Sequence, residues 1–549
     1  MTSDRDLHRD LLLRVTMHRR RFLGLAVAGA GSLALAACSG DDGAGQDDGG
    51  PDTTGPDTTT ASTTVPDAQG VTAEPFTLGV ASGDPLPGSV ILWTRLAPDP
   101  FDASGAGGLG DDDVAVAWEV ASDEAFDEVV ASGTEVAGAE FGHSVHVDVE
   151  GLDPDSWYWY RFRLGPYTSP VGRTRTTPAD SAPVDELRFA FASCQLRTSG
   201  HWTAYDHVVA DEPDLVVFLG DYIYEYPGGT GPLRVPLESE PADLADYRVL
   251  YAAYKSDAKL QAAHAAAPWV VTWDDHEVEN NYAAGVPEDA ADANTFEARR
   301  RAAYQAYWEH LPLRLAPPED GALQLHRAIR WGSLATFFVL DGRQYRTDQV
   351  CGDTIPTSAS ACPELDDEAH TMLGTEQEAW LTDGLAGADT TWKVLAQQTV
   401  MKALVLGDLV LNVDQWDGYP AARARLLRSI SDEGVENVVV LTGDIHAGGA
   451  ADIRLPDAGT AGDVVAHELV GTSISSPGLG AALAGAIDLT SMGLTYANFA
   501  DHGYVRCTVT PERWQADFMV VESIDRPTSD ASVDASVEVR AGTPGLRRV

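Results

Sequence analysis

The chain has 549 residues, enough for two or three domains and at least one large hydrophobic core. Its 84 acidic residues outnumber its 37 basic residues, which gives a formal net charge of −47 at pH 7. A surface this negative repels phosphate backbones, so the composition argues against general nucleic-acid binding. With 44% hydrophobic residues, the chain is expected to be globular.

Residues 1–38 are predicted to be an export signal. Arg19 and Arg20 precede the apolar stretch 23–37, which resembles a twin-arginine (Tat) signal and is too short for a comfortable membrane span. The stretch ends in Leu-Ala-Ala-Cys38, which resembles a lipobox whose cysteine receives lipid. We therefore expect an extracytoplasmic, membrane-anchored lipoprotein exported by the Tat translocase. An ordinary signal peptide that contains a cysteine is the alternative.

After the signal, residues 39–70 are rich in Asp, Gly, Thr and Pro and are predicted to form a disordered linker. Residues 72–178 contain short alternating apolar runs separated by turn signals, which predict a small β-sandwich domain. Translation from either Met1 or Met17 is compatible with this order of segments. The predicted strands of the sandwich are 89–95, 114–120, 144–149 and 157–163.

In residues 183–526, strands alternate with helical stretches, which predicts an α/β catalytic domain. Helices are expected at 295–308 and 375–385, where helix formers dominate. The last segment, 527–549, is polar and is predicted to be a tail that extends over the surface.

The five cysteines have different expected roles. Cys38 is the lipidation site. Cys351 and Cys362 flank a short polar loop, and a disulfide is expected there in an exported protein. Cys507 lies in an apolar segment and is expected to be a buried, inert thiol. Cys194 follows a buried strand beside other metal-binding residue types, so it is a candidate ligand.

Four predicted strands each end in residues that bind metals. Ligands of open α/β sheets lie beyond the carboxyl ends of the strands, so residues from distant segments can converge there. The strands lie in the apolar runs that begin at Leu187, Asp214, Pro268 and Asn437. They are followed by Cys194, by Asp221 and Tyr224, by Asp274 and Asp275, and by Asp444 and His446.

The residue types predict two kinds of metal side by side. Cysteine, tyrosine and histidine around Asp221 suit a redox-capable transition metal, most simply Fe(III). Asp275 and Asp444 add hard oxygen ligands that match Ca²⁺ or Mg²⁺ better. Each motif alone is weak, because an isolated Gly-Asp at a strand end is usually only a turn. Four such ends in one domain point to a site.

The chain contains the motifs Ser-Cys194-Gln, Gly-Asp221-Tyr-Ile-Tyr224-Glu, Trp-Asp274-Asp275-His276-Glu277, Asp341-Gly-Arg343-Gln-Tyr345-Arg346 and Gly-Asp444-Ile-His446. Their order and spacing resemble the alkaline phosphatase D (PhoD-type) family of calcineurin-like metallophosphoesterases. The resemblance covers about Ala73 to Ile524. It implies an α/β fold, a four-layer αββα metallophosphoesterase sandwich with an N-terminal fibronectin-like β-sandwich domain.

The resemblance also implies ligand sets. The positions that would hold Fe(3+) are Cys194, Asp221, Tyr224 and His446. The positions that would hold Ca(2+) are Asp221, Asp275 and Asp444. Asp275 and Asp444 are carboxylates where the superfamily has nitrogen ligands. Asn281 is a further candidate for the calcium site and for substrate binding. The choice between Asp274 and Asp275 as ligand stays open.

Two more residues receive roles from the resemblance. His276 matches the superfamily's catalytic histidine and would protonate the leaving oxygen; the alternative is a structural histidine bonded to a carboxylate. Arg343 would bind substrate and stabilise charge on the phosphoryl oxygens.

The expected function is an exported phosphodiesterase and phosphomonoesterase that hydrolyses phosphate esters with a metal-activated hydroxide. The alternatives are a phospholipase D-like hydrolase on the same metals and a surface-anchored binding protein with an inactive site. The substrate is left open among teichoic acid, nucleotides, phospholipids and simple esters. A monomer is expected.

Overall fold

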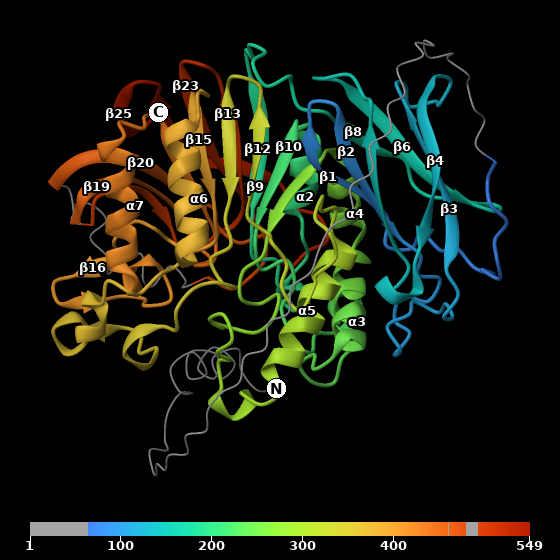
Figure 1. Cartoon of the computed structure of the whole chain (residues 1–549), viewed down its shortest axis with the longest axis horizontal. Coiled ribbons are helices and arrows are strands. Elements are labelled where there is room, and N and C mark those ends of the chain that lie inside the picture. Colours follow the sequence, from blue (N-terminus) through green and yellow to red (C-terminus); the bar gives the residue numbers. More distant parts are fainter. Residues whose placement is uncertain (1–63, 459–460, 479–491) are drawn as a thin grey trace, which may run out of the picture.

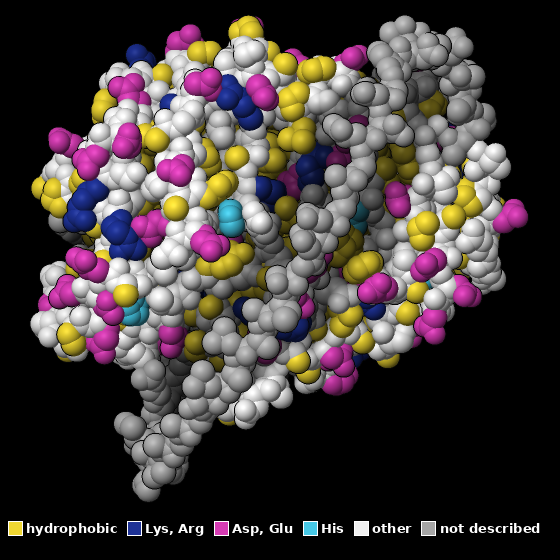
Figure 2. Space-filling view, viewed as in Figure 1, with side chains coloured by type: hydrophobic (Ala, Val, Ile, Leu, Met, Phe, Trp, Pro, Cys, Tyr) yellow, Lys and Arg dark blue, Asp and Glu magenta, His cyan; other side chains and the backbone are white. Residues whose placement is uncertain are grey.

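The structure is a computed structural model that describes residues 64–458, 461–478 and 492–549 (Figure 1). The predicted export signal with Cys38 and most of the predicted linker lie outside these residues. Within the described part of the chain, no helix is both long enough and apolar enough to cross a membrane. Asp and Glu side chains are spread over the face drawn in Figure 2, as the net charge of −47 leads one to expect.

The larger sheet has ten strands in the order β25-β24-β23-β22-β9-β10-β11-β1-β2-β5. Its central strands β9, β10 and β11 are parallel neighbours and almost entirely apolar, as is typical of strands covered on both faces. The strands contributed by the catalytic domain are β9 (Leu187–Ala192), β10 (Leu215–Leu219), β11 (Trp269–Thr272), β22 (His502–Val509), β23 (Arg513–Val521), β24 (Ala531–Arg540) and β25 (Thr543–Arg548).

A second sheet has seven strands in the order β12-β13-β15-β18-β20-β19-β21. Its middle strands β13, β15, β18 and β20 are parallel. The strands are β12 (Arg327–Trp331), β13 (Ala335–Val339), β15 (Trp392–Ala396), β18 (Val438–Thr442), β19 (Gly448–Ala458), β20 (Ala461–Val470) and β21 (Leu494–Asn498).

The two sheets face each other across an apolar core that contains Phe191 and Leu219 from one sheet and Val339 and Leu441 from the other. The outer face of each sheet packs against helices, and Figure 1 shows α6 and α7 well apart from α3 and α5. The predicted four-layer αββα sandwich is therefore confirmed. The helices are α2 (Ala204–Ala210), α3 (Leu244–Lys255), α4 (Ala258–Ala266) and α5 (Phe296–His310) on the larger sheet, and α6 (Gly374–Gly387) and α7 (Pro420–Asp432) on the smaller.

The N-terminal region forms the predicted β-sandwich around a core that includes Val90, Leu92 and Phe162. One of its sheets is continuous with the catalytic sheet, because Gly83 pairs with Trp269 of β11. This continuity was not predicted. The strands that extend the catalytic sheet are β1 (Val80–Leu86), β2 (Ser89–Arg95) and β5 (Ser144–Glu150). The opposing sheet contains β3 (Val114–Ala121), β4 (Val129–Ala137), β6 (Trp157–Leu164), β7 (Tyr167–Thr168) and β8 (Gly172–Arg175).

The predicted surface tail at 527–549 is wrong. Most of this segment forms β24 and β25, which extend the ten-stranded sheet through antiparallel pairing. Ala535, Val537 and Val539 are buried in the core between the two sheets. These residues alternate with polar ones, which is the signature of a half-buried strand. The prediction of a tail relied on the polar composition of the whole segment and overlooked this alternation.

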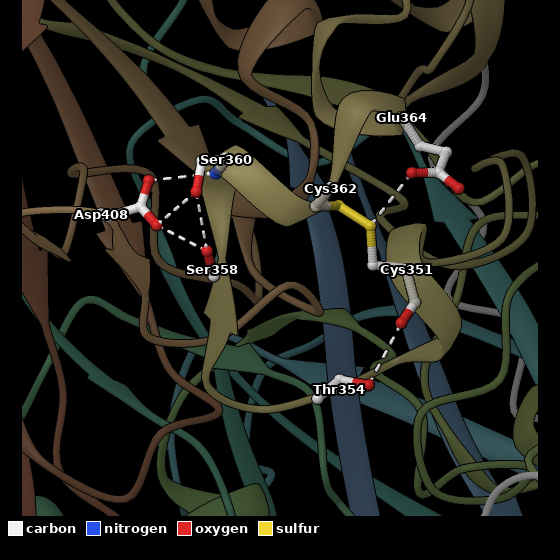
Figure 3. The surroundings of a disulfide bond; sticks show 7 residues. All are labelled: Cys351, Thr354, Ser358, Ser360, Cys362, Glu364 and Asp408. Atoms are coloured by element: carbon white, nitrogen blue, oxygen red, sulfur yellow. Dashed lines mark hydrogen bonds between the residues drawn. A yellow bond between two sulfur atoms is a disulfide. The ribbon is translucent and has the colours of Figure 1, made fainter.

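The structure joins Cys351 and Cys362, the pair expected from the sequence, in a disulfide 11 residues apart (Figure 3). The bonded segment packs beside a small sheet in the order β14-β17-β16, formed by Thr357–Ser358, Leu409–Val410 and Val405–Leu406. Asp408 accepts hydrogen bonds from the hydroxyls of Ser358 and Ser360. Hence two distant segments are clamped together, and the second of them leads directly to Asp414, discussed below.

Candidate metal centre

Residues from four strand ends meet at one place between the two sheets. Cys194, Asp221 and His446 offer ligand atoms that all lie within 4.8 Å of one another. A second group within the same limit contains only carboxylates: Asp221, Asp274, Asp275 and Asp444. Asp221 belongs to both groups. The structure thus brings together the sulfur and nitrogen donors on one side of Asp221 and hard oxygen donors on the other.

Four of these residues leave their strands in the left-handed backbone region. The φ angle is 61° at Cys194, 55° at Asp221, 62° at Asp444 and 53° at His446. This region is unfavourable for residues with a side chain, and such strain concentrates at functional sites. Backbone hydrogen bonds hold the turns, since Cys194 N–H donates to the carbonyl of Gly220 at 3.2 Å. The strained turns aim the side chains at a common point.

The glycine of each Gly-Asp motif allows close approach of neighbouring strand ends. A Cβ atom on Gly220, which has a φ of 95°, would lie 2.5 Å from Cβ of Asp274. A Cβ atom on Gly443 would lie 2.4 Å from the hydroxyl oxygen of Ser193, next to Cys194. Any larger residue would force these loops apart and separate the ligands.

Tyr224 lies between the donors of the first group. Its hydroxyl donates to Oδ2 of Asp221 at 2.8 Å, lies 2.9 Å from Nε2 of His446, and accepts a hydrogen bond from Ser476 at 2.7 Å. The Nδ1 atom of His446 lies 2.9 Å from the carbonyl of Pro477. A carbonyl can only accept, so Nδ1 carries the proton and the Nε2 lone pair faces Asp221 and Tyr224. That is the tautomer of a metal ligand.

Burial raises the pKa of the Tyr224 phenol and of the Cys194 thiol well above their usual values, and the charge of Asp221 adds to both effects. Neither group would ionise by itself at moderate pH. A bound cation reverses this preference, because it stabilises phenolate and thiolate directly.

The carboxylate group also fits a cation. Oδ1 of Asp221, Oδ2 of Asp274 and Oδ1 of Asp275 are buried and have no hydrogen-bond partner. Burial raises the pKa of Asp274 and of Asp275, and it raises that of Asp444 to about 7; neighbouring carboxylates contribute to each increase. Crowded, unpartnered carboxylates are costly unless positive charge offsets them. The residues present therefore suit a hard divalent ion.

Asn281, a predicted partner of this group, contacts it through the backbone. Its N–H donates to Oδ2 of Asp275 at 2.6 Å. Its carbonyl accepts a hydrogen bond from Gln349 at 2.7 Å. These contacts fix the orientation of Asp275 and leave Oδ1 of that carboxylate without a hydrogen-bond partner.

Arg343 differs from the prediction that it contacts substrate. The side chain is completely buried, and its Nε donates to Asp274. Its two terminal nitrogens bond both oxygens of Asp414, each at 2.9 Å, and one of them lies 3.6 Å from Oδ1 of Asp275. Carboxylates of the protein thus occupy the donors that would bind phosphoryl oxygens.

His276 lies close to Asp275 and Asp221, and the ligand atoms of the three residues are within 4.8 Å of one another. Its Nδ1 lies 2.7 Å from Oε2 of Glu225, and its ring is 4.2 Å from that of Tyr224. Burial alone would lower the pKa of His276, but Glu225, Asp275 and Asp221 outweigh it and raise that pKa well above the usual value. The contact with Glu225 agrees with the structural alternative, and the retained proton agrees with the acid role.

Sequence reasoning missed several residues that hold the site together. Glu277 accepts N–H bonds from Asp221 at 3.1 Å and from Asp274 at 2.8 Å, so it ties the ends of β10 and β11. Gln415 donates to Asp444. Glu225 and Glu277 lie in the same motifs as Asp221 and Asp275, so their positions in the sequence could have indicated a role at the site. Asp414, Gln415 and Ser476 lie in loops without a motif, and nothing in the sequence marked them.

Comparisons with known proteins agree with this geometry. The model of the PhoD-like phosphatase family matches residues 189–518, and that of the PhoD-like phosphatase N-terminal domain matches residues 60–178. Alkaline phosphatase D of Bacillus subtilis (strain 168) is 46% identical over 495 residues, which cover 88% of this chain and 84% of that protein. A solved structure titled "Structure of PhoD" superposes with a TM-score of 0.83 at 46% identity and covers 87% of this chain and 93% of that one. The chain belongs to the PhoD-like phosphatase family and is a phosphoric ester hydrolase.

Proposed function

We propose that this phosphoric ester hydrolase cleaves phosphodiesters and phosphomonoesters at a paired iron and calcium site outside the cytoplasm. The observation that carries the proposal is the position of Asp221. This carboxylate is common to a group with sulfur and nitrogen donors and to a group with carboxylates alone. Such a shared carboxylate is the arrangement expected of two adjacent cations that work on one phosphate.

On the first side, we assign Cys194, Tyr224, His446 and Asp221 to Fe(3+). Thiolate, phenolate and imidazole together favour a transition metal over calcium or magnesium. The orientation of the His446 ring and the buried Tyr224 hydroxyl support the assignment.

On the second side, we assign Asp221, Asp275 and Asp444 to Ca(2+). Calcium takes oxygen ligands with flexible geometry, and carboxylates are its usual protein ligands. Each of the two carboxylates keeps one oxygen without a hydrogen-bond partner. We choose Asp275 over Asp274 because Arg343 bonds Asp274 directly, whereas its guanidinium lies 3.6 Å from Asp275.

Cations at these positions would activate water and offset charge on the phosphoryl oxygens. In the proposed reaction, His276 donates its proton to the leaving oxygen, and Glu225 orients the imidazole and keeps it charged. Burial of the surrounding carboxylates excludes bulk water and strengthens each of these interactions.

The experiment is a metal analysis of the purified full chain together with a substrate panel. We expect iron and calcium in the protein. We also expect phosphate release from monoesters and release of an alcohol and a monoester from diesters, and both should stop after calcium is chelated. The panel should contain a teichoic acid, a nucleotide diester and a phospholipid. Cleavage confined to the phospholipid headgroup would favour the phospholipase D-like alternative. Metal-loaded protein that hydrolyses none of them would favour the binding protein.

We further propose Tat export and lipid anchoring at Cys38. Iron inserted in the cytoplasm gives a physical reason to export a folded chain, and the twin arginines at 19–20 fit that route. Replacing Arg19 and Arg20 with Lys should trap precursor inside the cell. Cys38→Ala should release the enzyme from the membrane fraction, because the acyl chains provide the anchor. A Cys38→Ala protein as firmly membrane-bound as the wild type would overturn the lipid assignment.

A further inference from the structure

Asp414 is a buried carboxylate that contacts two arginines and none of the proposed metals' ligands directly. It follows β17 in the chain and accepts two hydrogen bonds from Arg343, one from Arg346 and one from Gln349 at 2.7 Å. The side chains of Asp414, Arg343 and Arg346 are all 2% exposed or less. The two arginines hold the pKa of Asp414 well below its usual range despite burial. This carboxylate is therefore a permanent negative charge.

The contacts continue to the carboxylate group as a chain of alternating charges. Arg343 links Asp414 to Asp274, and Arg346 stands at the far end. Two positive and two negative groups balance each other. From this fixed position, the guanidinium of Arg343 lies 3.6 Å from Oδ1 of Asp275. Because the surroundings are buried, the net charge of this network acts strongly on any cation bound beside it.

We propose that Arg343 and Asp414 are positioning residues that set the charge and the ligand choice of the divalent-cation site. Asp414 compensates Arg343, so the guanidinium can sit beside the site without expelling a cation. Arg343 in turn holds Asp274 and leaves Asp275 as the ligand. This inference rests on the proposed function in one respect, namely that a divalent ion binds at Asp275.

The test uses changes of opposite charge within the same network. Asp414→Asn removes a negative charge, so calcium affinity should fall by about tenfold or more. Arg346→Gln removes a positive charge, so calcium affinity should stay equal or increase. The double variant restores the balance and should bind calcium within about threefold of the wild type. A merely structural role would weaken binding in all three variants, and most in the double variant.

Binding is measured by titrating Ca²⁺ into the full-length protein after chelation, with iron content and thermal unfolding recorded for each variant. The matched control is Asp417→Asn, because Asp417 forms a similar buried pair with Arg423 at 2.6 Å on the same segment but lies outside the four-carboxylate group. It should leave calcium affinity unchanged. If the Asp414→Asn chain does not fold, Arg346→Gln and the double variant still carry the comparison.

Equal losses in Arg346→Gln and Asp414→Asn, or no recovery in the double variant, would overturn the inference. So would a wild-type protein that binds no Ca²⁺, Mg²⁺ or Mn²⁺. In that case ester hydrolysis by the same preparation would still support the proposed hydrolytic function, so the two failures are distinguishable.

Discussion

Asp221→Asn is expected to lose both metals and to lower kcat/KM by about three orders of magnitude or more, because the substitution removes the one charge common to both ligand groups. Asparagine preserves the shape of the side chain and its contact with Tyr224, so the loss should arise from charge. Its amide cannot supply a bridging carboxylate.

Metal content and turnover should be measured on the same preparation. The matched control is Asp214→Asn, at the opposite end of the same strand, where the carboxylate accepts the Arg188 N–H at 2.9 Å and pairs with Arg175. This buried change perturbs the strand without touching the site. Loss of metal in the control as well would attribute the effect to folding. An Asp221→Asn enzyme that retains iron and calcium would refute the bridging assignment.

The sequence was sufficient to predict that the ligands converge. The four apolar runs that begin at Leu187, Asp214, Pro268 and Asn437 contain strands β9, β10, β11 and β18. Short runs this apolar are expected to form buried strands of a parallel sheet. Residues that follow the carboxyl ends of parallel strands meet at one edge of the sheet. The left-handed turns at Cys194 and His446 could not be predicted, since they depend on contacts with neighbouring loops.

Arg343 illustrates what a motif cannot give. Its position after β13 was correctly read as lying near the site, but the direction of its side chain depends on Asp414, which lies 71 residues later in a loop. No local pattern encodes an ion pair of that sequence separation. A long, flexible side chain can face substrate or protein from the same backbone position, and only the partner decides which.

The errors at the chain's ends have a different origin. Strands β24 and β1 join a sheet whose other strands come from elsewhere in the sequence. The predicted domain boundaries divide the chain into consecutive segments, so they separate strands that belong to the same sheet. For β24, the alternation of Ala535, Val537 and Val539 with polar residues was present in the sequence. For β1, the only registered pair with β11 is Gly83 with Trp269, and no pattern in the sequence predicts this pairing.

Tyr224→Phe is expected to remove the phenolate charge-transfer band from the visible spectrum of the iron-loaded protein while much of the iron remains. Phenolate bound to Fe(III) gives a charge-transfer band, and phenylalanine has no oxygen to supply it. Three other proposed ligands, Cys194, Asp221 and His446, would still hold the ion. Turnover should fall by about tenfold or more, because the remaining ligands leave the iron more positive and less well positioned.

The control is the neighbouring Tyr222→Phe. Tyr222 is also completely buried, and burial raises its pKa as it does that of Tyr224, but its hydroxyl lies 2.8 Å from Nε2 of His264 in the helix-covered core. It should keep the band at full intensity. Spectra and iron content must be compared at equal protein concentration. A Tyr224→Phe protein that retains both its iron and its visible band would exclude the tyrosinate, and the colour would then have to arise from the thiolate of Cys194.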